Sequence, residues 1–140
     1  MPPMFVCRGL FALTLISAMH AVLSAAEPPS FSRDILPILS DNCFSCHGPD
    51  AKAREADLRL DQQDSALRTE KPIIVPGNSG ASELMKRILS TDSETVMPAP
   101  KSGRKLTAAQ KDLLKAWIDS GAKWGKHWAF EPIQRPAVPQ

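Results

Sequence analysis

The chain has 140 residues and a formal net charge of +2, from 17 Lys and Arg against 15 Asp and Glu. This length favours one domain and excludes a second sizeable core. The charge is nearly balanced and forms no basic block, which argues against nucleic-acid binding as the main function. Three cysteines are too few for a disulfide scaffold, and 13 prolines indicate a linker or rigid loops.

Residues 1–26 have the pattern of a secretory signal peptide. Residues 10–23 carry no charge and are too few to span a bilayer, which takes about 20 apolar residues. The small residues at 24–26 then provide a cleavage site, although an uncleaved N-terminal anchor is the alternative. We therefore expect export to the periplasmic or cell-surface side of the membrane. Cleavage removes Cys7, so the mature chain keeps two cysteines.

A short linker, residues 27–30, leads into a helix predicted over residues 35–46. Asp34 is the expected N-cap, and Gly48 is expected to end the helix. The spacing i, i+3, i+7 and i+10 defines one helical face. The residues on that face are Leu36, Leu39, Cys43 and Cys46.

The middle of the chain has weaker signals. Residues 50–76 are polar and irregular, with one turn of helix expected around residues 65–68. Residues 78–80 are expected to cap a second helix over residues 81–89, and a loop follows over residues 91–105. The expected apolar side of the second helix consists of Leu84, Met85, Ile88 and Leu89.

The last helix, residues 107–120, has the clearest pattern. Thr107 and Gln110 form a capping box, and Gly121 occupies the position just after the helix, where glycine is favoured. Its apolar side chains recur at helical spacing and are Leu113, Leu114, Trp117 and Ile118. After residue 128 the sequence becomes proline-rich, so we interpret residues 129–140 as a tail or linker.

The sequence Cys43-Phe44-Ser45-Cys46-His47 is the C-x-x-C-H signature of c-type haem attachment. On a helix, positions i, i+3 and i+4 lie on one face, so both thiols and the imidazole point to the same side. We therefore expect Cys43 and Cys46 to form thioether bonds to one haem, and His47 to be the proximal iron ligand.

Three other interpretations fit a C-x-x-C pair less well. A thioredoxin-like redox pair requires a preceding strand in a βαβ unit, whereas a helix is predicted here. A zinc site requires a fourth ligand, for which only the distant His127 is available. A disulfide between Cys43 and Cys46 closes a strained, small loop and leaves His47 without a role.

Met97 is the favoured second axial ligand because prolines at 98 and 100 restrict the loop that carries it. Met85 fits core packing better, and His127 fits a surface position, but both are alternatives, as is an open or water-bound iron. Three apolar side chains could either wall the haem or simply pack between helices. They are Phe31, Leu113 and Trp117.

These motifs, in this order, resemble the planctomycete-type cytochrome c domain of the class I cytochrome c superfamily, over roughly residues 31–128. The stretches that carry the resemblance are residues 31–50, 58–61, 73–88, 96–100 and 106–124. The resemblance implies an all-α class I cytochrome c fold, with about three to four helices packed around haem c, and His47 and Met97 as axial ligands. Related proteins often carry this domain at the front of a longer chain, and the tail resembles the junction to such further domains.

The expected function is one-electron transfer by a monomeric haem protein that is not itself an enzyme. Its expected partner is a redox protein or a fused catalytic domain, with no nucleic acid and no membrane span after signal cleavage. A haem enzyme or ligand sensor with an open distal iron site is the alternative. Lys101, Arg104 and Lys105 could form a positive rim for a partner, or simply a solvated loop.

Overall fold

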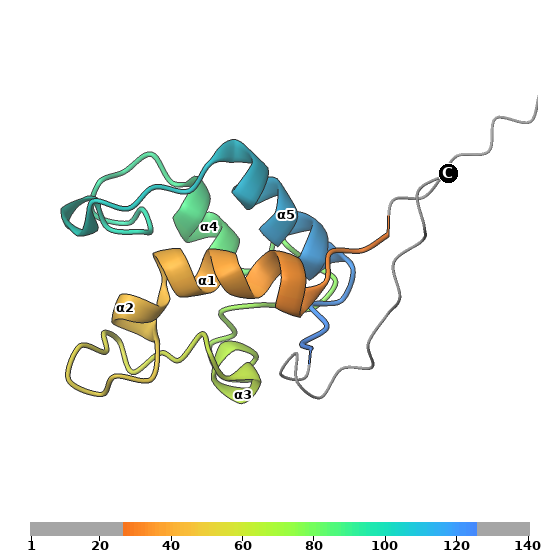
Figure 1. The fold of residues 1–140 in the computed structure, drawn as a ribbon, viewed down its shortest axis with the longest axis horizontal. Helices are drawn as coiled ribbons and strands as arrows, with labels where there is room; N and C mark the ends of the chain where they lie inside the picture. The colour runs from red at the N-terminus through yellow and green to blue at the C-terminus, as the bar shows by residue number, and fades with distance from the viewer. Residues whose placement is uncertain (1–26, 126–140) are drawn as a thin grey trace, which may run out of the picture.

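The structure is a computed structural model, and it describes residues 27–125. The expected signal peptide and the tail after residue 125, including His127, lie outside the described residues. The described part of the chain is helical and contains no strand, which confirms the all-α prediction (Figure 1). Within the same residues, no helix combines the length and the apolar character that crossing a membrane would require.

Five α-helices are described, where three to four were expected, because two of them are four-residue turns. A π-helical segment and a 3₁₀ turn accompany them. In chain order the elements are η1 (Phe31–Ile35), α1 (Leu36–Asn42), α2 (Phe44–His47), α3 (Gln63–Ala66), α4 (Glu83–Leu89), η2 (Pro100–Ser102) and α5 (Ala108–Asp119).

The first helical region begins earlier than the sequence suggested. The π-helical turn η1 starts at Phe31 and runs directly into α1, so Asp34 is inside the helical region and is not its N-cap. The early start is explained by burial, since Phe31 and Ile35 both enter the core. Asp34 instead accepts a hydrogen bond from the backbone N–H of Ser30 at 2.8 Å.

The helix α4 begins two residues later than expected, at Glu83, with Ser82 as N-cap residue. The buried Ser82 hydroxyl accepts a hydrogen bond from the Val75 N–H and donates one to the Asn78 carbonyl, both at 2.9 Å. These bonds hold residues 75–82 in a turn instead of a helix. Leu89 was expected on the apolar side, but it is 56% exposed because the helix ends there.

The last helix agrees closely with its prediction. Thr107 accepts a hydrogen bond from the Gln110 N–H at 3.2 Å, and the Gln110 side chain accepts one from the Thr107 N–H at 2.9 Å. This is the predicted capping box. Gly121 follows the helix at a φ of +104°, a conformation that favours glycine.

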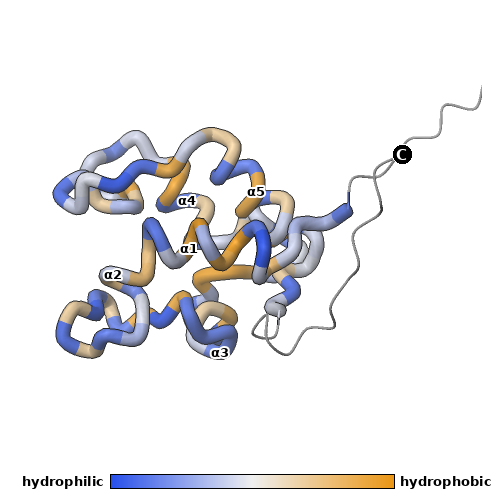
Figure 2. Tube along the Cα trace, in the orientation of Figure 1, coloured by the Kyte–Doolittle hydropathy of each residue, from blue (hydrophilic) through white to orange (hydrophobic). Residues whose placement is uncertain are grey.

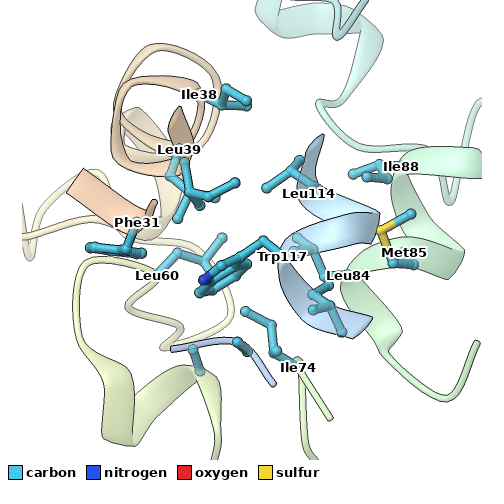
Figure 3. Close-up of a cluster of buried hydrophobic side chains, with 14 of the residues drawn as sticks. Phe31, Ile38, Leu39, Leu60, Ile74, Leu84, Met85, Ile88, Leu114 and Trp117 are labelled. Carbon is cyan, nitrogen blue, oxygen red and sulfur yellow. The ribbon is translucent and has the colours of Figure 1, made fainter. Parts of the chain in front are cut away.

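The core forms around Trp117 on α5, which is fully buried (Figure 3). Its ring centroid lies 5.7 Å from that of Phe31 and 5.8 Å from that of Trp124. The helix α5 packs against both η1 and α4, so the start of the domain and the segment before the Met97 loop share one core. Figure 2 shows hydrophobic residues along the helices that contribute to this core, and several hydrophilic stretches in the two long loops.

Those two loops are what the fold provides for a functional site. The loop after α2 and the loop between α4 and α5 both extend to the α2 side of the molecule, beyond the end of α1 that leads into α2 (Figure 1). The first loop follows the C-x-x-C-H residues, and the second carries Met97. The C-x-x-C-H residues and Met97, which are at least 50 positions apart, are therefore brought to one end of the helical core.

Asp119 on α5 accepts a hydrogen bond from Ser79 in the turn before α4, and this contact should make the stability of the protein depend on pH. Hydrogen bonds from Lys115 and from the Ser79 N–H hold the pKa of Asp119 down to about 2. Because this is below the usual value of about 3.9, the stabilisation is present above pH 4 and is lost as the pH falls through 2. We expect Asp119→Asn to lower the melting temperature at pH 6, with a difference from wild type that shrinks towards pH 2.

Asp112→Asn is the matched control, since Asp112 is exposed on the same helix and its side chain forms no hydrogen bond or ion pair within residues 27–125. Its melting temperature should stay close to wild type from pH 2 to pH 6. An Asp119→Asn deficit that does not change with pH would contradict the assigned role of the carboxylate.

Candidate functional site

The C-x-x-C-H residues lie at a break between two helices. Cys43 has a φ of −121°, so α1 ends before it and α2 begins after it. Two hydrogen bonds still bridge the break, from the Cys43 N–H to the Leu39 carbonyl and from the His47 N–H to the Cys43 carbonyl, both at 2.8 Å. The predicted single helix over residues 35–46 is therefore interrupted, but its backbone remains continuous in hydrogen bonding.

The chain turns away directly after His47 because Gly48 is a glycine. A Cβ atom at Gly48 would lie 2.3 Å from the Phe44 carbonyl oxygen, a distance that real Cβ atoms do not adopt. The Arg54 side chain then holds the returning loop, donating to the Gly48 carbonyl at 3.2 Å and to the Pro49 carbonyl at 3.1 Å. Gly48 thus fixes where α2 ends and His47 is presented.

The returning loop also orients the His47 ring. The Nδ1 atom of His47 lies 3.2 Å from the Glu55 carbonyl oxygen. The Glu55 N–H donates to the Cys46 carbonyl and the Leu60 N–H donates to the His47 carbonyl, each at 2.8 Å. A carbonyl can only accept, so Nδ1 carries the proton and the lone pair is on Nε2, free for a metal.

Met97 is held in place by contacts with α4 and with its own loop, and not by the segment that orients His47. Its N–H donates to the Arg87 carbonyl at the C-terminal end of α4, at 3.1 Å. Earlier in the same loop, the Ser90 and Thr95 hydroxyls are 2.7 Å apart, and the Val96 N–H donates to the Asp92 carbonyl at 2.8 Å. The position of the Met97 backbone therefore depends on α4 and on a loop with its own internal hydrogen bonds.

All four predicted site residues line one cavity of about 960 Å³. They are Cys43, Cys46, His47 and Met97. This volume is at the upper end of the range of about 300–1,000 Å³ that is typical of small-molecule and cofactor sites. Apolar residues from α4 and from the segment after α2 complete much of the wall, including Leu58, Leu60, Ile73, Leu84 and Ile88.

Neither thiol is bonded to another residue in the described part of the chain. Burial raises the pKa of the Cys43 thiol to about 11, and the charge of Arg104 acts in the opposite direction. Cys46 accepts a weak contact from the Ser45 hydroxyl at 3.8 Å. Cys43 is therefore a largely buried thiol with a raised pKa, and Cys46 is a thiol with one weak contact; both lie in the cavity wall.

Three other predicted positions do not belong to this cavity. Phe31 and Trp117 form the aromatic cluster with Trp124, and Leu113 is 37% exposed on α5. None of them lines the cavity, so of the two roles left open, their positions agree with packing between helices and not with a haem wall. Helix packing explains them instead. Met85 is buried in the core on α4, as its packing interpretation predicted (Figure 3).

The cavity also contains charged residues that the sequence analysis missed. Glu83 and Arg87 form an ion pair at 2.8 Å on α4 and both line the cavity, as does Arg68. The i, i+4 spacing of Glu83 and Arg87 beside Leu84 and Ile88 could have indicated a pair at the edge of the apolar face. No sequence pattern could have indicated that the Glu55 carbonyl contacts His47, because every residue has a backbone carbonyl.

The residues fit a covalently held iron porphyrin. Two thiols, an imidazole with a free Nε2 and a thioether face one mostly apolar cavity of suitable size. Within residues 27–125 there is no strand for a thioredoxin-like unit and no group of three His, Cys, Asp or Glu residues that could hold a metal ion. The helical fold and this donor set together define a cytochrome c-like domain.

Residues 43–101 match the family model described as Planctomycete cytochrome C. The match begins at the first thiol of the motif and includes Met97, and it confirms the resemblance seen in the sequence. Residues 43–101 are therefore similar to a haem-binding cytochrome c domain of the planctomycete type. Comparison with curated proteins and with solved structures gave no match.

Proposed function

We propose that the chain is a one-electron carrier with one haem c, attached through Cys43 and Cys46. In this proposal His47 and Met97 would hold the iron as its two protein ligands. The observation that supports it is the single cavity that these four residues share. The bound haem would supply an iron that alternates between two oxidation states.

The protein's contribution on the proximal side is to orient the imidazole. The hydrogen bond from Nδ1 of His47 to the Glu55 carbonyl fixes the orientation of the ring and directs Nε2 away from the returning loop. A hydrogen bond of this kind also raises the basicity of the ligating nitrogen. The proposed proximal ligand is therefore held ready before the cofactor is bound.

On the distal side, the neutral thioether of Met97 would fill the last coordination position. A His/Met pair raises the reduction potential relative to other axial pairs. The hydrogen bond from the Met97 N–H to the Arg87 carbonyl ties the ligand to α4, so the chain would reorganise little when the electron arrives or leaves. Such rigidity suits electron transfer better than ligand exchange or catalysis.

We further propose that the domain is exported and works on the periplasmic or cell-surface side, as the motif for covalent haem attachment and residues 1–26 both suggest. Its electron donor or acceptor would be a redox partner protein or a catalytic domain fused to it. The haem domain itself would be monomeric.

The test is a redox titration of the full chain, produced in a host with haem-attachment machinery and followed by absorption spectroscopy. We expect one reversible transition involving one electron, and slow binding of carbon monoxide to the reduced protein. Rapid carbon monoxide binding would instead favour the alternative function, a haem enzyme or sensor with an open distal site.

A further inference from the structure

A second groove adjoins the main cavity at the Met97 loop. Its volume is about 490 Å³. The groove and the main cavity share Ile88, Met97, Pro98 and Pro100 in their linings, so these residues form the wall between them. Anything that occupies the groove therefore rests against the segment that carries Met97.

The groove is lined by cations without acidic neighbours. Arg104, Lys105 and Lys111 line it, and among residues 27–125 no Asp or Glu does. The side chains of these three residues form no ion pair or hydrogen bond within residues 27–125, where Arg33, Arg59 and Arg87 each pair with a carboxylate. Residues 97–111 contain four cations and no acid in total, counting Lys101 at the edge of the main cavity.

The remainder of the lining is apolar. Val96 and Leu106 face the groove together with the residues of the shared wall. A bare inorganic anion would neutralise the cations but would leave the apolar residues exposed to water. Such an anion would therefore gain no binding free energy from burial of apolar surface. An occupant that covers both parts needs carboxylates and an apolar side chain close together, which an acidic protein segment provides.

We propose that this groove is a docking surface for an acidic segment of a protein partner, one that carries an apolar residue between its carboxylates. The proposal rests on the proposed function in one respect: the partner would be the protein that exchanges electrons with the haem. Complementary charge would speed the encounter and select the partner, and the apolar contact would hold it beside the Met97 loop.

The experiment measures binding of a short synthetic peptide of glutamates around a central leucine to the full chain, by calorimetry at low salt. Two comparison peptides replace the glutamates with glutamines or the leucine with glycine. We expect binding by the first peptide only, weakened by added salt. Equal binding of the glycine peptide would overturn the proposal, because the apolar residues that line the groove would then contribute nothing to binding.

Charge variants locate the site. The double variant Arg104→Gln and Lys105→Gln should weaken binding about tenfold, since both residues line the groove. The matched control is Lys52→Gln with Lys123→Gln, which removes the same charge from exposed residues outside the groove and should change binding less than about twofold. Lys111→Gln, on a different element, should weaken binding as well.

Equal loss in the two double variants would overturn the proposal, because the attraction would then be general. Groove-dependent binding of a single-stranded oligonucleotide without binding of the peptide would also overturn it. The readout does not depend on the haem: absence of haem on the cysteines would refute the proposed function, while the peptide titration would still decide whether the groove binds acidic segments.

Discussion

Met97→Ala is expected to change the iron site more than any other single substitution outside the C-x-x-C-H motif. The oxidised protein should lose the weak red absorption band of methionine-ligated ferric haem, and the reduced protein should bind carbon monoxide rapidly. The reduction potential should fall by a sizeable part of the roughly 0.8 V range over which axial ligands set haem potentials. The reason is that, within the described part of the chain, no other thioether lines the main cavity.

Met85→Leu is the matched control, because Met85 is the other methionine of α4 and its loop and is buried in the core. A leucine of similar volume should cost less than about 1.5 kcal/mol of stability and leave the spectrum unchanged. If Met97→Ala leaves both the spectrum and the potential as in wild type, Met97 is not a ligand.

Trp117→Ala is expected to cause the largest loss of stability, about 3–5 kcal/mol. Trp117 is fully buried between Phe31 and Trp124, and its indole N–H donates to the Lys123 carbonyl at 3.0 Å. Such a loss is a large share of the 5–15 kcal/mol that stabilises an ordinary domain. Guanidinium unfolding of the haem-loaded protein measures it.

Leu113→Ala provides the comparison, since Leu113 is on the same helix but 37% exposed. It should cost about 1 kcal/mol or less, because an exposed side chain leaves little cavity behind. Equal losses for the two variants would mean that the aromatic cluster does not anchor the fold.

The parts of the fold that could be predicted are those encoded by local patterns. The capping box of Thr107 and Gln110 and the stop at Gly121 define α5 almost to the residue, because each acts through the backbone next to it. The C-x-x-C-H motif likewise needs only one helical turn to bring its three functional groups together. Met97 could be placed near them because prolines restrict its loop.

The parts that could not be predicted depend on distant contacts. The early helix start at Phe31 is driven by the aromatic cluster with Trp117 and Trp124, which no local pattern reveals. The same cluster decides between the two roles that the sequence left open for Phe31 and Trp117, since it holds both in the core and away from the cavity. The late start of α4 depends on the hydroxyl of Ser82, which bonds to Val75 and Asn78 across a turn.

The site shows the same division. Cys43, Cys46 and His47 were found from their spacing, whereas the carbonyl of Glu55 that orients His47 is a backbone group brought back by a loop. Near the Met97 loop, the sequence indicated a group of cations but not the groove that they line. Its concave, partly apolar shape depends on how α4, the loop and α5 meet.

Covalent attachment of haem to the C-x-x-C-H residues is best tested by mass spectrometry of the full chain made with a haem-attachment system. We expect the fragment that contains residues 43–47 to carry the mass of one haem, held through both Cys43 and Cys46. The same fragment with two unmodified thiols, in a host that attaches haem to other c-type cytochromes, would contradict the proposed function.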